Sequence, residues 1–258
     1  MPERDLSILI HAAREAGKIA SGYFGGSYTQ EDKPGGAGPV TEADLAVNVM
    51  LEETLRAERP DYGWLSEESE DSATRLRRER LFIVDPLDGT RSFIAGETTW
   101  AHSLAIAEEG RVIAAVIYLP MRDRLYAAAR GAGATLNGSP IRASARRALK
   151  GATLLAARPA LRPELWKDGA VPQVERVYRP SLAYRLGLVA QGRYDAMITL
   201  RDSWEWDIAA GALILEEAGA LVTDRHGAPL RFNNAHPQVP GVVAAASGIH
   251  RELQGALA

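Results

Sequence analysis

The sequence predicts an α/β protein in which helices and sheets pack in layers. Residues 5–59 contain two runs with apolar residues at intervals of three and four, which is the spacing of amphipathic helices. Residues 101–141 contain β-rich runs separated by turn residues, and the second half alternates helix-like with strand-like segments. Helices, then an antiparallel sheet, then mixed α and β segments together predict an α/β (α+β) layered sandwich.

Two helices joined by a loop are predicted at the start of the chain. The first helix covers residues 5–23 and ends in glycines. The second covers residues 41–59 and stops before Pro60, which cannot continue a helix. Between them, residues 31–39 (EDKPGGAGP) have the composition of turns and no apolar periodicity, so we expect a loop there.

Strands are predicted in the middle of the chain. Residues 63–65 look like a short strand, and residues 81–84 form an apolar run typical of a strand buried on both faces. A β-meander then follows over residues 103–108, 111–119 and 125–129, and Asn137 with Gly138 predicts a tight turn.

The second half of the chain is predicted to be mixed. Helices are expected at residues 181–191 and 207–218, and strands at residues 196–200 and 220–223. Polar and basic residues interrupt the pattern near 142–152. We therefore expect an N-terminal half at 1–145 with most candidate ligands and a C-terminal half at 146–258, joined in one compact unit.

Composition excludes several classes of protein. The chain has 258 residues, 33 acidic against 30 basic side chains, a net charge of −3 and no cysteine. Without cysteine there are no disulfide frameworks, thiol nucleophiles or cysteine metal sites. We see no basic cluster in the sequence and expect no nucleic acid polymer as partner. The start is too charged for a signal peptide and no apolar run could span a bilayer, so we expect no membrane insertion and a cytoplasmic location.

The most informative stretch is Asp85-Pro86-Leu87-Asp88-Gly89-Thr90, which places two carboxylates three residues apart at the end of a buried strand. Pro86 cannot donate to a sheet, so the chain should leave the ladder there. Carboxylates could then bind a metal, and the amides that follow could bind a phosphate. The alternative is that Pro-x-Asp-Gly is simply a good turn.

Three further acidic sites accompany this stretch, and each has a structural alternative. Glu67 and Glu68 follow a predicted strand, where they could also be a solvated charge cluster. Asp44 has the spacing of a helix capping box, and Asp207 stands where a helix N-cap is expected. Oxygen ligands without cysteine or histidine favour magnesium or manganese over zinc. No serine-hydrolase or P-loop motif offers another mechanism.

These motifs resemble one known family. VTEAD (40–44), SEES (66–69), DPLDGT (85–90) and EWDIAAG (205–211) are similar to motifs of the inositol monophosphatase superfamily of magnesium-dependent, lithium-sensitive phosphatases. The resemblance implies the αβαβα layered sandwich of the inositol monophosphatase and fructose-bisphosphatase type. It also implies two or three Mg²⁺ ions, with Mn²⁺ as a substitute, a small phosphate ester as partner, and leaves a homodimer open.

Carried over residue by residue, the resemblance gives each candidate a role. Glu67, Asp85 and the Leu87 carbonyl would bind the first metal, and Asp85, Asp88 and Asp207 the second. Glu68 would be a helper carboxylate or a ligand of a third magnesium. Thr90 would orient the attacking water with Asp44 accepting its proton, and the amides of Gly89 and Thr90 would contact the phosphate beside Asp207. Ser66 departs from the family, which usually has glycine before the two glutamates.

The sequence indicates the substrate less specifically than it indicates the metal site. Trp204 and Trp206 could stack a base, and Arg201 with Arg158, Arg179 or Arg185 could bind a second phosphate. These residues resemble CysQ-type 3′(2′),5′-bisphosphate nucleotidases, which convert 3′-phosphoadenosine 5′-phosphate to AMP, and this is the substrate the sequence favours. The alternatives are inositol monophosphatase acting on myo-inositol 1-phosphate, histidinol-phosphate phosphatase, and a phosphate-ligand-binding or scaffold protein without activity.

We also expect residues 31–38 to act as a lid. Five glycine, proline and alanine positions at 34–38 leave little to hold this segment against the core. It would be mobile without substrate and close towards the metals, with Lys33 the residue nearest the phosphate. A passive connector is the alternative.

Overall fold

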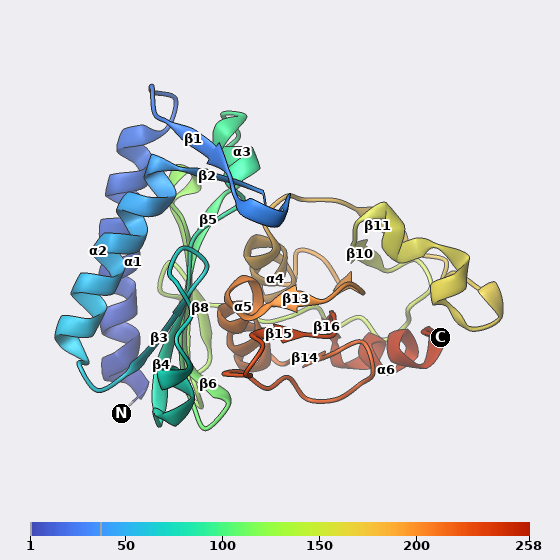
Figure 1. Ribbon diagram of the computed structural model, residues 1–258. Coiled ribbons are helices and arrows are strands. Elements are labelled where there is room, and N and C mark those ends of the chain that lie inside the picture. Colours follow the sequence, from blue (N-terminus) through green and yellow to red (C-terminus); the bar gives the residue numbers. More distant parts are fainter. Residues whose placement is uncertain (1, 37) are drawn as a thin grey trace.

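Five alternating layers of helix and sheet build the protein, as the ribbon of the computed structural model shows (Figure 1). The structure describes residues 2–36 and 38–258. From left to right in Figure 1 the layers are α1 with α2, a large sheet, α4 with α5, a smaller sheet, and α6. This confirms the predicted αβαβα sandwich.

The outer helix layer consists of α1 (Pro2–Tyr23) and α2 (Glu42–Glu58). Their apolar stripes, with Leu9 and Val47 fully buried, pack against the large sheet, while the opposite faces meet water. Both predicted helices are confirmed, within three residues at each end. Helix α2 begins after Thr41, whose side chain forms the predicted capping box with Asp44.

The large sheet has seven strands in the order β3-β4-β5-β6-β7-β8-β9. Strands β3 and β4 are parallel, and every other neighbouring pair is antiparallel. The predicted meander and the two-residue turn at Asn137 and Gly138, both with positive φ, are therefore confirmed. The bounds of the strands are β3 Gly63–Ser66, β4 Arg80–Asp88, β5 Ala101–Glu108, β6 Arg111–Leu119, β7 Arg124–Ala129, β8 Ala134–Leu136 and β9 Ser139–Pro140.

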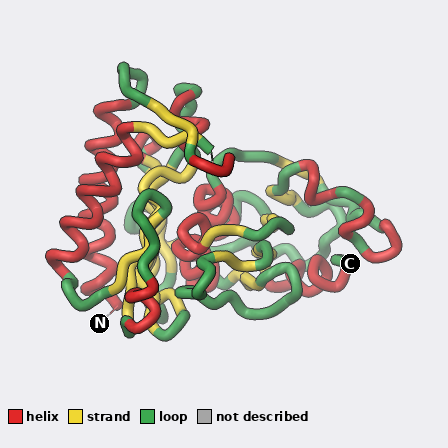
Figure 2. Tube along the Cα trace, in the orientation of Figure 1, coloured by secondary structure: helices red, strands yellow, loops and turns green. Residues whose placement is uncertain are grey.

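The prediction of an irregular loop at 31–39 is wrong at the ends of that segment. β1 (Gln30–Asp32) and β2 (Pro39–Thr41) form an antiparallel hairpin, drawn in yellow at the top of Figure 2. All three residues of β1 are exposed, so main-chain hydrogen bonds hold the pair and leave no apolar pattern in the sequence. The expected mobility and closure of 31–38 stay a prediction, and residue 37 lies outside the described residues.

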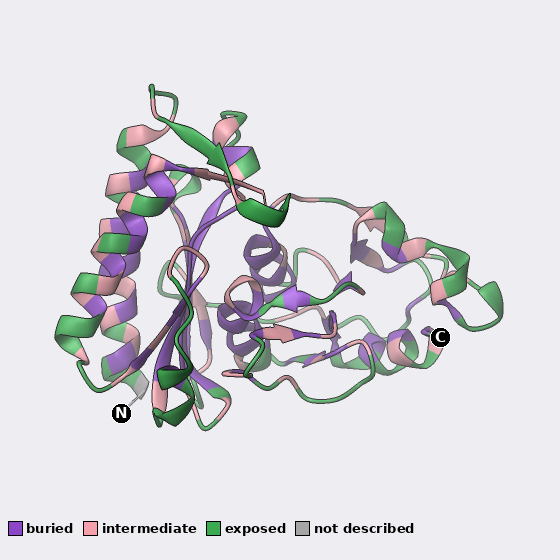
Figure 3. Ribbon diagram, in the orientation of Figure 1, coloured by how far each residue is buried: buried purple, intermediate pink, exposed green. Residues whose placement is uncertain are grey.

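The middle helix layer contains α4 (Leu182–Ala190) and α5 (Glu205–Glu217), which lie between the two sheets and are largely buried (Figure 3). The prediction that α5 begins with Asp207 as N-cap is wrong. The helix begins two residues earlier, with Trp204 as N-cap and Asp207 at the third helical position. The early start has a physical reason, because the Glu205 carboxylate accepts hydrogen bonds from the Asn233 and Asn234 amides and anchors the first turn.

The smaller sheet has the strand order β11-β10-β12-β16-β14, and α6 (Ser247–Ala256) covers its outer face. Strands β12 and β14 match the predicted strands, whereas β10, β11, β16 and α6 were not predicted. A two-stranded sheet, β13 with β15, and the short helix α3 complete the fold. The bounds are β10 Thr153–Leu155, β11 Glu175–Val177, β12 Ala196–Thr199, β13 Ser203–Trp204, β14 Ala220–Thr223, β15 Gln238–Val239, β16 Val242–Ala246 and α3 Thr90–Ile94.

One hydrophobic cluster crosses the middle of the molecule. It contains Leu81 and Ile117 from the large sheet, Leu186 and Leu213 from the middle helices, and Ala244 from the smaller sheet. Residues 141–152, which include the predicted boundary, contain no helix or strand and connect the two sheets. The division into halves at 1–145 and 146–258 stays a prediction, but the two parts share this core. Among the described residues, no helix combines the length and the apolar character needed to cross a membrane.

Candidate active site

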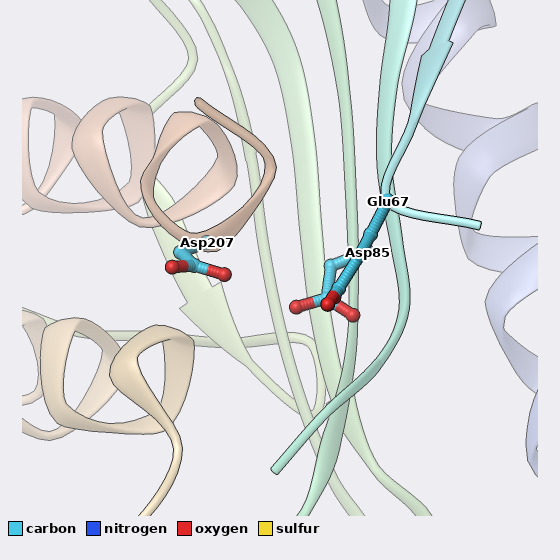
Figure 4. A group of neighbouring side chains, drawn as sticks. All are labelled: Glu67, Asp85 and Asp207. Atoms are coloured by element: carbon cyan, nitrogen blue, oxygen red, sulfur yellow. The ribbon is translucent and has the colours of Figure 1, made fainter. Parts of the chain in front are cut away.

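Two neighbouring strands bring Glu67 and Asp85 together. β3 and β4 run parallel with Ser66 opposite Val84, so Glu67, which follows β3, lies beside Asp85 of β4. Asp207 faces them from the first turn of α5 (Figure 4). Each of the three carboxylates has an oxygen within 4.8 Å of the others, so residues from distant parts of the sequence form one acidic group.

A bulge at Pro86 shapes the segment between the two aspartates. β4 pairs Asp85 with Ser103 and then Asp88 with Ala101, so β4 contains one residue more than its partner strand over this interval. The prediction that the chain leaves the ladder at Pro86 is therefore only partly right, because the pairing is interrupted at Pro86 but resumes at Asp88. Within the bulge, the Leu87 amide donates to Asp85 Oδ1 at 2.9 Å.

Asp88 lies in the same cavity as the acidic group but is fixed by the middle helix layer. Its Oδ2 accepts hydrogen bonds from Ser181 Oγ and from the Ala183 amide, both at 2.7 Å. Gly89 follows with φ of 102°, a conformation that favours glycine, and α3 starts at Thr90. The predicted roles of Asp88 as a metal ligand and of the Gly89 amide as a phosphate contact stay predictions.

Thr90 and Asp44 are in contact although they are 46 residues apart. Thr90 Oγ1 donates to Asp44 Oδ1 at 2.9 Å, and the Thr41 amide donates to Asp44 Oδ2 at 2.9 Å. Asp44 therefore belongs to the capping box and also holds the hydroxyl predicted to orient water. Burial raises the pKa of Asp44, although hydrogen bonds from Thr41 and Thr90 work against this rise.

The electrostatics of the acidic group indicate a cation site. Burial, and then repulsion from neighbouring carboxylates, raise the pKa values of Asp85 and Asp207 well above the usual range. Asp85 Oδ2 is buried and has no hydrogen-bond partner in the described part of the chain. A divalent cation would remove the repulsion and give this oxygen a partner. The all-oxygen donor set fits magnesium or manganese.

Glu68 and Glu67 share one lysine. Lys33 Nζ donates to Glu67 Oε1 at 2.7 Å and to Glu68 Oε1 at 2.6 Å. Lys33 thus contacts two acidic residues of the site, and its predicted approach to the phosphate on closure of residues 31–38 stays a prediction. Burial raises the pKa of Glu68 from 4.5 to about 7 despite the hydrogen bond from Lys33.

This pKa gives a testable pH dependence for the metal-free protein. The folded state holds a proton on Glu68 at pH values where the unfolded chain has lost it, so folding stability decreases as pH rises from about 4.5 to about 7. The raised pKa values of Asp85 and Asp207 likewise make folding stability decrease as the pH rises. We expect the melting temperature without metal to fall between pH 5 and pH 8, and the fall to be smaller in Glu68→Gln. A variant with the wild-type slope would contradict this assignment.

A cavity of about 900 Å³ opens above the acidic group. Its acidic lining residues are Glu67, Asp85, Asp88, Glu164 and Asp207. Its basic lining residues are Arg91, Arg162, Arg185 and Arg201, and Tyr178 is the one aromatic side chain among its described lining residues. The cavity therefore presents both acidic and cationic side chains.

The other predicted substrate residues lie elsewhere. Trp204 stacks on Trp206 with ring centroids 4.7 Å apart and an interplanar angle of 7°. Neither tryptophan, nor Arg158 or Arg179, is among the described residues that line the cavity. The two indole rings stack on each other. Because Trp204 is not among the described lining residues, it is not placed to stack a base inside the cavity.

Sequence reasoning missed three residues that support the site. Asn48 accepts a hydrogen bond from Ser66 and donates to the Glu68 carbonyl, which gives the unusual Ser66 a structural role. His102 Nδ1 contacts the Pro86 carbonyl behind the bulge, and burial lowers its pKa to about 4, so the ring is neutral. Ser181 fixes Asp88, and its position as the N-cap of α4 was the signal that could have identified it.

A layered α/β sandwich with three convergent carboxylates and a hydrogen-bonded threonine–aspartate pair is the arrangement expected of metal-dependent small-molecule phosphatases. The chain belongs to the inositol monophosphatase family, whose sequence model matches residues 1–258. That family is in general magnesium-dependent.

Individual relatives agree with this assignment. The chain is 37% identical over 232 residues to an inositol-1-monophosphatase of Rhizobium meliloti, a match that covers 86% of each chain. It is 34% identical over 233 residues to the Nus factor SuhB of Escherichia coli, which covers 86% of this chain and 85% of SuhB. The crystal structure of the extragenic suppressor protein suhB from Bartonella henselae superposes with a TM-score of 0.81 at 30% identity, covering 98% of this chain and 97% of that one.

Proposed function

We propose that the protein hydrolyses inositol monophosphates with magnesium as cofactor. The observation that carries the proposal is the convergence of Glu67, Asp85 and Asp207 on one point beside the Thr90 hydroxyl. The inositol-1-monophosphatase among the relatives supports the choice of substrate. This ranking differs from the sequence-based preference for a bisphosphate nucleotide, because the tryptophan pair expected to bind the base lies outside the cavity.

The acidic residues of the cavity would hold the metal ions that this function requires. Glu67, Asp85 and the Leu87 carbonyl would hold one ion, and Asp85, Asp88 and Asp207 another, with Glu68 nearby. When bound, Mg²⁺ supplies Lewis acidity that makes water a better nucleophile at neutral pH and offsets charge on the phosphate. The positions of these carboxylates would determine where the ions, and therefore the activated water, lie.

The residues of the chain orient water and move a proton. Because Thr90 Oγ1 donates its own hydrogen to Asp44, its lone pair faces the cavity and can accept a proton from water. Water attacks phosphorus, the ester P–O bond breaks, and the leaving alkoxide takes a proton from solvent water to become the alcohol. The proton lost by the water passes to Thr90, whose hydroxyl proton moves to Asp44, and the raised pKa of Asp44 favours this step.

Phosphate release from a panel of esters tests the substrate. We expect kcat/KM to be highest for myo-inositol 1-phosphate, above 3′-phosphoadenosine 5′-phosphate, fructose 1,6-bisphosphate and histidinol phosphate. A higher value for the nucleotide would reverse the ranking without changing the acidic site. Absence of release from every ester with magnesium present would favour the non-enzymatic alternative, a binding or scaffold protein.

A bisphosphate nucleotidase is the second candidate, because four guanidinium groups, those of Arg91, Arg162, Arg185 and Arg201, line the cavity. Arg185 and Arg201 could bind a second phosphate, and the half-exposed Tyr178 could stack a base. If this alternative holds, Arg201→Ala raises KM for the nucleotide much more than KM for a small phosphate ester. The difference corresponds to a loss of about 1 to 3 kcal/mol in the binding free energy of the nucleotide. Equal effects on both substrates would assign Arg201 a structural role.

A further inference from the structure

A second cavity lies away from the acidic group and is lined by arginines. It has a volume of about 440 Å³ and is formed by the start of β7, the helix α4 and the residues that flank that helix. Four of its lining residues are Arg122, Arg124, Arg179 and Arg193, and no carboxylate residue is among the lining side chains that the structure describes. The four arginines come from two segments of the chain, with Arg122 and Arg124 in one and Arg179 and Arg193 in the other, which is why no basic cluster was apparent in the sequence.

The charges of these arginines are not neutralised within the protein. None of the four takes part in an ion pair formed by the described residues. Their side-chain partners are neutral instead. Arg122 Nη1 donates to Tyr184 Oη at 3.3 Å, Arg124 Nη1 to Gln191 Oε1 at 3.2 Å, and Arg179 Nη2 to Tyr194 Oη at 3.0 Å.

Aromatic rings also hold two of the guanidinium groups. Arg122 lies over the Tyr184 ring at 5.7 Å from its centroid, and Arg179 lies over the Tyr194 ring at 5.8 Å. Each tyrosine oxygen accepts a hydrogen bond from an arginine, so its own proton is free to donate to a ligand. The cavity thus combines fixed guanidinium groups with hydroxyl donors.

We propose that this cavity binds a small, multiply charged anion of the phosphate class. Guanidinium groups match the geometry of phosphate oxygens and can bind them in pairs. Four like charges around one cavity repel one another, and a bound anion would relieve that repulsion. The protein as a whole has a net charge of −3, so this concentration of positive charge is local.

The second cavity is connected to the first through a short segment. The carbonyl of Arg179 accepts a hydrogen bond from Arg185 Nε, and Arg185 lines the first cavity. Two residues after Arg179, Ser181 donates to Asp88. An anion bound to the Arg179 side chain would therefore restrain the segment that positions Arg185 and Asp88. The binding itself does not depend on the proposed activity.

Calorimetric titration with pyrophosphate tests the proposal. The protein is stripped of metal with EDTA and dialysed, so that no metal ion in the first cavity binds the probe. We expect the double variant Arg124→Gln/Arg193→Gln to bind pyrophosphate at least tenfold more weakly than the wild type. The control Arg4→Gln/Arg251→Gln changes two exposed arginines by the same charge and should bind within about twofold of the wild type.

The outcomes of this experiment are distinct from those of the phosphatase assay. Equal binding by the wild type and the Arg124/Arg193 variant, or no binding by the wild type at millimolar pyrophosphate, would overturn the proposal. If the double variant does not fold, Arg193→Gln alone serves, because this side chain is exposed. A short single-stranded RNA is titrated in parallel, and tighter binding of RNA that the same variant loses would overturn the assignment to a small anion.

Discussion

Replacing Asp207 by asparagine is expected to lower kcat for phosphate release by about a hundredfold or more while the protein stays folded. The substitution keeps the size of the side chain and removes one negative charge from the acidic group with Glu67 and Asp85. Loss of that charge weakens the cation site that the proposed chemistry needs. Because Asp207 is the third residue of α5 and not its N-cap, the helix retains its start.

The measurement is kcat at saturating magnesium, with circular dichroism to verify folding. Asp202→Asn is the matched control, since Asp202 is an exposed aspartate five residues earlier and lies outside the described lining of the cavity. It should retain nearly full activity. If Asp207→Asn lowered stability and left kcat unchanged, the residue would have a structural role only.

Removing metal is expected to abolish turnover and to lower the melting temperature. Buried carboxylates that repel one another cost stability in the metal-free protein, and a cation that binds only the folded state offsets this cost. At a magnesium concentration one hundred times its dissociation constant, the gain is about 2.7 kcal/mol. Lithium in the millimolar range should inhibit, as the family resemblance implies.

Thermal melts with and without magnesium measure this effect, and phosphate release is followed in the same samples. The magnesium-dependent rise in melting temperature should shrink in Asp207→Asn. Manganese should restore activity in part, because it accepts the same oxygen ligands. Full turnover by metal-free protein would refute the metal-dependent proposal.

Elements with one buried and one exposed face were predictable from the sequence. Helices α1 and α2 show this alternation, and so their apolar spacing is visible in the sequence. β4 and β12 are buried on both faces and were predicted from their apolar runs. β16 (VVAAA) is also buried at every position, but its three alanines follow only two β-branched residues, so its strand signal is weak. The β1–β2 hairpin was not predicted for a different reason. Its β1 strand is exposed throughout, so the strand has no apolar residues that would mark it in the sequence.

The acidic residues of the site were predictable because each stands at the end of a recognisable element. Glu67 follows β3, Asp85 precedes the bulge of β4 at Pro86, and Asp207 lies in the first turn of α5. The contacts that position them were not predictable, because they join distant residues. Ser181 reaches Asp88 over 93 residues, and no local pattern encodes such a pairing. The stacking of Trp204 on Trp206 likewise depends on backbone geometry at the start of α5.

The parallel pairing of β3 with β4 limits where residues can be inserted or deleted without disturbing the site. Leu65 pairs with Ile83, and Ser66 pairs with Val84, so the pleat that buries Leu65 also sets the direction in which Glu67 leaves the strand. Deleting one residue from β3 would turn Leu65 out of the core and carry Glu67 away from Asp85 in the same step. The exposed connection at residues 70–74 lies outside this strand pairing, so a change in its length does not shift Glu67 relative to Asp85. Insertions and deletions accumulated during divergence should therefore occur in that connection, while the length of β3 stays fixed.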